Sequence, residues 1–106
     1  MRRFLLIGFI LLAGGIAQGA TSTYPTVALK ELPDGLRSTW MQLKPEMTEF
    51  SHCAAAWDSQ SDGDRMILKC SIYIKMSAEG ERRAMHYCDE KRAEKKINGP
   101  CRLVVP

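Results

Sequence analysis

The residue types that could support catalysis are few in this chain of 106 residues. Nucleophilic catalysis needs a serine, cysteine or threonine beside an oriented base. The sequence has no Gly-x-Ser-x-Gly motif, and its only histidines are His52 and His86. A Cys–His pair could act only through a free thiol, and the cysteines are expected to be oxidised. We therefore predict that the protein is not an enzyme and has no catalytic residue and no cofactor.

The four cysteines are the strongest chemical signal in the sequence. An even number of cysteines in a short exported chain is typical of disulfides. Zinc is the alternative, because His52 adjoins Cys53 and His86 lies two residues before Cys88. However, there is no Cys-x-x-Cys, and the cysteine spacings of 17, 18 and 13 fit no standard zinc pattern. We predict no metal site and two disulfides, with three pairings possible among Cys53, Cys70, Cys88 and Cys101.

An acidic segment at 58–64 has some features of a calcium-binding loop. Asp58, Asp62 and Asp64 surround Gly63. With Asp58 at the first loop position, the twelfth position is Lys69, where a calcium loop needs a bidentate glutamate. We therefore interpret the segment as a solvated hairpin turn.

The first nineteen residues have the layout of a secretory signal peptide. Arg2 and Arg3 precede an apolar run of about 14 residues, and small residues follow it. Cleavage after Gly19 fits this layout best, and cleavage after Ala17 is nearly as good. A retained membrane anchor is the alternative, but a spanning helix needs roughly 20 apolar residues. We expect a periplasmic or secreted protein, which agrees with disulfide formation.

Length and composition fit one small domain. Apolar residues make up 45% of the chain and charged residues 25%, which is ordinary for a globular protein. The formal net charge is +3, and removing residues 1–19 leaves about +1, so the charge gives no support for nucleic-acid binding. We expect a mobile segment or a short edge strand at 20–34, followed by a single disulfide-bonded domain at 35–106.

A short helix is predicted over 35–43. Its apolar residues are spaced four and three apart, as one helix face requires: Leu36, Trp40 and Leu43. Pro45 would cost about 3 kcal/mol inside a continuous helix, so the helix is expected to end before it. Residues 46–57, which follow, are compatible with either a helix or a strand.

In residues 65–76, every second side chain is apolar, and the side chains between them are of mixed type. This alternation predicts a strand with one buried face. If 49–57 folds back across the turn as a second strand, one register places Cys53 opposite Cys70 at a distance that allows a disulfide. A helix over 46–57 would also leave these two cysteines near each other. Two further pairs share the buried face in the strand register: Trp57 with Met66, and Ala55 with Leu68.

A longer helix is predicted over about 78–97, with Ser77 as its N-cap and Asn98-Gly99 as its C-cap. Residues 101–105 are predicted to form a final strand. If the helix folds back onto that strand, Cys88 comes near Cys101. The chain thus predicts an α+β fold in which the long helix covers a three-stranded antiparallel sheet. The predicted disulfides are Cys53–Cys70 and Cys88–Cys101.

The last part of the chain resembles the tail of small exported bacterial domains. These domains typically carry an Ala-Leu-x-x-Cys helix followed by a Cys-x-Val strand. Here Ala84-Met85-His86-Tyr87-Cys88 is followed, after twelve residues, by Cys101-Arg102-Leu103-Val104-Val105. The resemblance covers 77–105, and the Gly-rich strand turns expected earlier in such domains are missing. It implies a Cys88–Cys101 bridge and a bacterial periplasmic setting, and it assigns no functional residue.

The charges are unevenly distributed. Residues 20–64 hold three basic and seven acidic residues, whereas 82–102 hold seven basic and three acidic residues. A basic helix could dock on an acidic partner or on anionic lipid, or its cations could simply complement the helix dipole in a solvated face. The candidate partner-binding residues are Arg82, Arg83, Lys91, Arg92, Lys95 and Lys96.

A small disulfide-bonded protein without catalytic groups suits binding. We expect a module that binds another protein of the cell envelope and not nucleic acid, such as an inhibitor or an immunity-type protein acting on an envelope enzyme. One alternative is a structural envelope protein that contacts the membrane or cell wall through the basic helix. Another is a metal or small-ligand carrier that uses His52, His86, Met66, Met76 and Met85.

Overall fold

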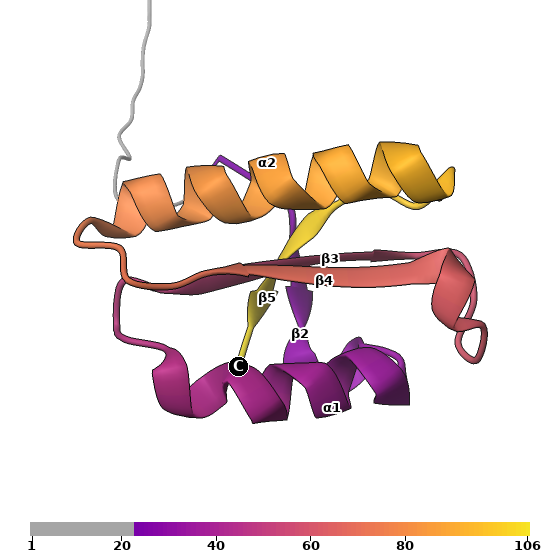
Figure 1. Cartoon of the computed structure of the whole chain (residues 1–106), viewed down its shortest axis with the longest axis horizontal. Helices are drawn as coiled ribbons and strands as arrows, with labels where there is room; N and C mark the ends of the chain where they lie inside the picture. The colour runs from indigo at the N-terminus through magenta and orange to yellow at the C-terminus, as the bar shows by residue number, and fades with distance from the viewer. Residues whose placement is uncertain (1–22) are drawn as a thin grey trace, which may run out of the picture.

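The computed structural model describes residues 23–106 as an α+β fold in three layers (Figure 1). A four-stranded sheet lies between α1 on one face and α2 on the other, with strand order β2-β5-β3-β4. The expected signal peptide at 1–19 lies outside the described residues. The helices and strands are β2 (Thr26–Ala28), α1 (Asp34–Leu43), β3 (His52–Trp57), β4 (Met66–Ser71), α2 (Ser77–Lys95) and β5 (Arg102–Val105).

The sheet differs from the predicted three-stranded antiparallel sheet. β3 pairs antiparallel with both β4 and β5, as expected, but β2 adds a fourth strand parallel to β5. The amide of Leu103 also donates to the carbonyl of Pro25 at 2.8 Å, just before β2 begins. β2 lies within 20–34 and matches the edge-strand alternative for that segment. Three residues are too few to show a strand period, which is why the prediction of three strands was wrong.

α1 confirms the predicted helix and its end. Leu36 and Trp40 are buried from this helix, and the chain continues after Leu43 as a single 3-10 turn, Lys44–Glu46. Pro45 lies within that turn, where its missing N–H removes no α-helical hydrogen bond. The buried face of α1 therefore follows directly from the spacing of its apolar residues.

The β3–β4 hairpin has the predicted register, and residues 52–57 form a strand rather than a helix. Cys53 lies opposite Cys70, and the two are joined by a disulfide. They are directly opposed at a non-hydrogen-bonded position, where strands bring residues closest, and their Cα atoms are 3.9 Å apart, closer than is usual even there. The register pairs Trp57 with Met66 and Ala55 with Leu68.

Both faces of the hairpin are covered, so the prediction of a half-buried strand was incomplete. Met66 belongs to the core on the α1 side, whereas Ile67 belongs to the core on the α2 side. Ser71 is also buried, and its hydroxyl donates to the carbonyl of Gly80 in α2 at 2.8 Å. The period of two distinguishes the faces of a strand but does not show whether the second face is solvated.

β4 ends at Ser71 and does not continue to residue 76 as predicted. The segment that would have to pair with 72–76 is a turn, in which Ser51 donates its amide to the carbonyl of Thr48 at 3.0 Å. Tyr73 then takes a left-handed backbone conformation, with φ 60°. The apolar sequence of 72–76 favours a strand, but no strand in the described part of the chain pairs with it.

α2 starts and ends slightly differently from the predicted helix. Its N-cap is Met76 rather than Ser77, and its C-cap is Lys96 in the left-handed conformation rather than Asn98-Gly99. Gly99 instead packs against the Trp57 backbone, where a Cβ would overlap the carbonyl oxygen. The second predicted disulfide, Cys88–Cys101, is present and joins α2 to the residue that precedes β5.

The Asp58 carboxylate connects the hairpin to the end of α2. It accepts hydrogen bonds from the amides of Asn98 and Gly99, each at 2.7 Å. These amides, together with Arg65, hold the pKa of Asp58 below its ordinary value, although partial desolvation opposes the shift. Asp58 is therefore a capping group between two loops, a role that its place in an acidic turn did not reveal.

Candidate functional site

The six basic candidates do not form one free cationic surface. Arg82 and Arg83 both bind Glu79, at 3.0 and 2.7 Å from their Nε atoms. Lys91 binds Glu94 at 3.1 Å. The remaining three lie near the end of α2: Arg92 donates to the carbonyls of Gly99 and Asn98, and Lys95 and Lys96 are exposed. Much of the basic charge of α2 is therefore balanced by its own carboxylates.

We expect the Glu79 carboxyl to titrate far below an ordinary glutamate. Hydrogen bonds from Arg82 and then Arg83 lower its pKa from 4.5 to about 2. Because the pKa is lower in the folded state, these pairs stabilise the protein above about pH 4.5, and their contribution is lost as the pH falls toward 2. Carboxyl chemical shifts measured against pH would check this, and a midpoint near 4.5 would contradict the pairing. The substitution of Arg82 and Arg83 by glutamine should return the midpoint toward 4.5.

The structure does not gather the residues of the carrier alternative. Met66 and Met85 lie in the two cores on opposite faces of the sheet. His86 is on α2, with its Nε2 3.4 Å from Glu90, while His52 lies at the start of β3. Within 23–106, no group of three or more histidine, cysteine, aspartate or glutamate side chains is arranged to hold a metal ion.

His52 does meet a hydroxyl that sequence reasoning missed. Its Nε2 lies 2.7 Å from Oγ of Ser77, the first residue of α2. A serine–histidine pair could generate a nucleophile if a third group oriented the ring. Among the described residues, no carboxylate lies within ion-pair distance of the His52 ring. The contact therefore joins the starts of β3 and α2 without the third member of a catalytic triad.

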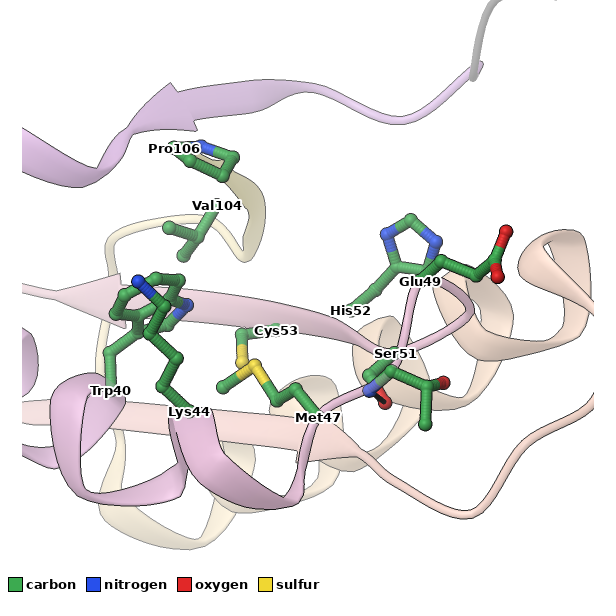
Figure 2. A pocket seen from close by; sticks show the side chains of 10 residues that line it. Trp40, Lys44, Met47, Glu49, Ser51, His52, Cys53, Val104 and Pro106 are labelled. Atoms are coloured by element: carbon green, nitrogen blue, oxygen red, sulfur yellow. Dashed lines mark hydrogen bonds between the residues drawn. The ribbon is translucent and has the colours of Figure 1, made fainter.

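A groove of about 510 Å³ opens on the α1 side of the sheet (Figure 2). In Figure 2, Trp40 and Lys44 lie at one side, Val104 and Pro106 at another, and Met47 lies between the tryptophan and the start of β3. The Lys44 ammonium is 5.5 Å from the centre of the Trp40 ring. The remaining lining residues are Thr48, Glu49, Ser51, His52 and Cys53. The groove combines an apolar floor with a polar rim, the usual composition of a binding pocket.

A second surface lies where β4 ends, and we call residues 73–76 with Arg83 the Tyr73 surface. Tyr73 is 77% exposed and Met76 is 65% exposed. The Tyr73 surface, together with Glu79, lines a shallow hollow of about 230 Å³. Exposed apolar side chains gathered in one place mark interaction sites more often than single exposed residues do.

The Tyr73 surface is held from several sides. The hydroxyl of Tyr73 donates to Oε1 of Glu46 at 3.2 Å, and this carboxylate raises the pKa of Tyr73 above its ordinary value. Cys70 anchors the preceding strand through its disulfide, and α2 begins directly after Met76. The sequence contained one signal for this surface. The apolar run at 65–76 continues beyond Ser71, where β4 ends.

No known protein family, curated protein or solved structure matches this chain. The two disulfides indicate an oxidising compartment, because such bonds rarely persist in the cytosol. Within residues 23–106, neither helix has the length and apolar character needed to cross a membrane.

Proposed function

We propose that this protein is a small exported module that binds another protein of the cell envelope, as an inhibitor or immunity-type protein does. The observation that carries the proposal is the Tyr73 surface. It presents a tyrosine, a methionine and an arginine together, and these residue types are enriched in protein interfaces. Tyr87, which is 38% exposed, lies one turn along α2 from Arg83 and extends the same surface.

The exposure of Tyr73 is not explained by the needs of the fold. A tyrosine at a positive φ is an uncommon and strained residue, and such residues collect at functional sites. Its ring is left in solvent although the neighbouring sheet has an apolar core. A side chain already held in place loses little conformational freedom on binding, which favours affinity. We therefore assign Tyr73 as the central contact of the proposed interface.

A small-ligand carrier is the second candidate, and the groove beside Trp40 favours it. Its volume of about 510 Å³ lies within the range of pockets that hold small molecules. The ligand would have an apolar body and a polar end near Lys44, Glu49 or His52. Mass spectrometry of the native protein from its producing cell distinguishes the candidates, because a carrier would retain a small molecule and a protein-binding module would retain a protein.

The Tyr73→Ala, Met76→Ala double variant is expected to lose partner binding by about tenfold or more, since interface anchors commonly contribute over 1.4 kcal/mol each. The measurement is affinity capture from an envelope extract with the oxidised protein as bait, followed by quantitative mass spectrometry. The identified partner is then titrated against both forms to give the two dissociation constants.

Met41→Ala is the matched control. Met41 is 55% exposed on α1 and does not line the Tyr73 surface. It should leave the captured amount unchanged. Equal capture by wild type and the double variant, or a loss with Met41→Ala alone, would remove the Tyr73 surface as the interface.

A further inference from the structure

Among residues 23–106, no strand lies beside the outer edge of β4. β4 is the last strand in the sheet order and pairs only with β3. In Figure 1, β4 runs between α2 and α1, and no described segment is drawn across it. An open edge of this kind can accept an additional strand from another chain.

The register of the hairpin shows which backbone groups face outward. The amide of Asp58 donates to the carbonyl of Arg65 at 2.8 Å, so the next hydrogen-bonded pair is Ala56–Ile67 and the pairing alternates from there. The N–H and C=O groups that point away from β3 belong to Met66, Leu68 and Cys70. No described residue forms a hydrogen bond with these outward groups.

Apart from one lysine, the edge lacks the usual protection against strand addition. Natural edge strands are often interrupted by proline, a bulge or several charges. β4 has no proline, and its six residues pair with β3 in unbroken register. Lys69 is its one charged side chain, and it lies on the same face as Ile67, toward α2. Leu68 and Cys70 are half-buried on the α1 face, so they leave apolar surface for a neighbouring strand to cover.

At the end of this edge where the Tyr73 surface lies, both nearby carboxylates are already hydrogen-bonded, Glu46 to Tyr73 and Glu79 to Arg82 and Arg83, whereas two lysines are not. Within 23–106, neither Lys69 nor Lys75 forms an ion pair. The acidic residues Asp62 and Asp64 lie at the opposite end, in the turn before β4. A segment that pairs along the second half of β4 therefore meets two uncompensated positive charges.

We propose that the β4 edge accepts an extended acidic segment of the partner protein as a fifth strand. This rests on the proposed function and specifies how the partner binds next to the Tyr73 surface. Acidic side chains of the added strand would lie on the α2 face beside Lys69, and its apolar side chains would cover Leu68 and Cys70. A second copy of this chain fits less well, because symmetric pairing places two Lys69 side chains on the same face of adjacent strands.

The test uses a synthetic seven-residue peptide that alternates glutamate and valine, with a lysine–valine peptide as its control. Amide hydrogen exchange of the oxidised protein is followed by NMR with and without each peptide. In the free protein we expect fast exchange at the outward amides of Met66, Leu68 and Cys70. The glutamate peptide should slow hydrogen exchange at these three amides. The amides that already bond to β3 should be protected both with and without the peptide: Ile67, Lys69 and Ser71.

Charge reversal provides the second measurement. Two exposed ion pairs should favour the glutamate peptide over the lysine peptide by roughly fivefold. The double variant Lys69→Glu, Lys75→Glu should reverse this preference, and Lys69→Gln, Lys75→Gln should abolish it. Folding of both variants is checked by the unchanged protection of the amides that face β3.

Four results would overturn the proposal. They are no peptide binding at millimolar concentration, binding without protection of the outward amides, protection already present in the dilute free protein, and protection that grows with protein concentration alone. The last result would assign the edge to a second copy. If any of these occurred while Tyr73→Ala, Met76→Ala still lost the partner, the proposed function would stand and only strand addition would fail.

Discussion

Replacing Gly80 with alanine is expected to destabilise the protein by about 3 kcal/mol and to lower its melting temperature on the order of 15 °C. A Cβ at this position would overlap the carbonyl oxygen of Phe50 and would lie 3.2 Å from Oγ of Ser71. The overlapped atom belongs to the backbone, so the contact cannot be relieved by a side-chain rotation. The first turn of α2 would have to move away from β3 and β4.

This expectation opposes the one from helix propensity alone. Alanine is favoured over glycine by about 1 kcal/mol inside a helix, so an exposed site would be stabilised by the same change. Thermal and urea unfolding of Gly80→Ala therefore distinguish the two effects. Gly63→Ala is the control, because no atom lies within 4 Å of a Cβ at Gly63, and its effect should stay within about 0.5 kcal/mol. If Gly80→Ala were as stable as wild type, α2 would not pack as closely as described.

Removing the Cys88–Cys101 disulfide is expected to cost about 3 kcal/mol of stability. The two residues are 13 apart, and closing a loop of about this size restricts the unfolded chain by that amount. Both side chains are almost completely buried, at 0% and 4% exposure, so the loss of sulfur packing adds to the effect. The variant is Cys88→Ala, Cys101→Ala, which leaves no free thiol, and the measurement is urea unfolding.

The Cys53→Ala, Cys70→Ala variant is the matched comparison. Its 17-residue separation predicts nearly the same chain-entropy effect, but Cys70 is only partly buried and loses less packing. We expect this variant to be less destabilised than the one without Cys88–Cys101. The reverse order, or a loss below about 1 kcal/mol for Cys88→Ala, Cys101→Ala, would show that helix packing holds β5 in place without the bridge.

The proposed interface depends on the same structural supports. Gly80 allows α2 to begin close to β4, and the Cys53–Cys70 bridge fixes the strand that leads into Tyr73. Gly80→Ala is therefore unsuitable for testing binding, because it would disturb the surface and the fold together. Tyr73→Ala, Met76→Ala changes two exposed side chains and removes a single exposed hydrogen bond, from Tyr73 to Glu46, so it disturbs the fold far less.

Of the candidate site, the sequence predicted little. It identified the basic residues of α2 from their charge, but the structure pairs Arg82 and Arg83 with Glu79. It named Met76 only as a candidate ligand of a metal or small-ligand carrier, and it placed Tyr73 in the alternating run at 65–76 without assigning it a role. Whether such a run is covered depends on whether another segment lies beside it, and the turn at 48–51 prevents that here.

The sequence by itself predicted most of the local elements and the cysteine pairing, although it left 46–57 open between helix and strand. The spacing of Leu36 and Trp40 specified α1, and alternation around a turn brought Cys53 opposite Cys70. These features follow from periods and turns that lie within a few residues of one another. Only the tertiary structure decided that both faces of the sheet are covered, that β2 joins β5, that β4 stops at Ser71 and that no other described strand pairs with its outer edge. Each of these depends on segments far apart in the chain, whose packing no local period records.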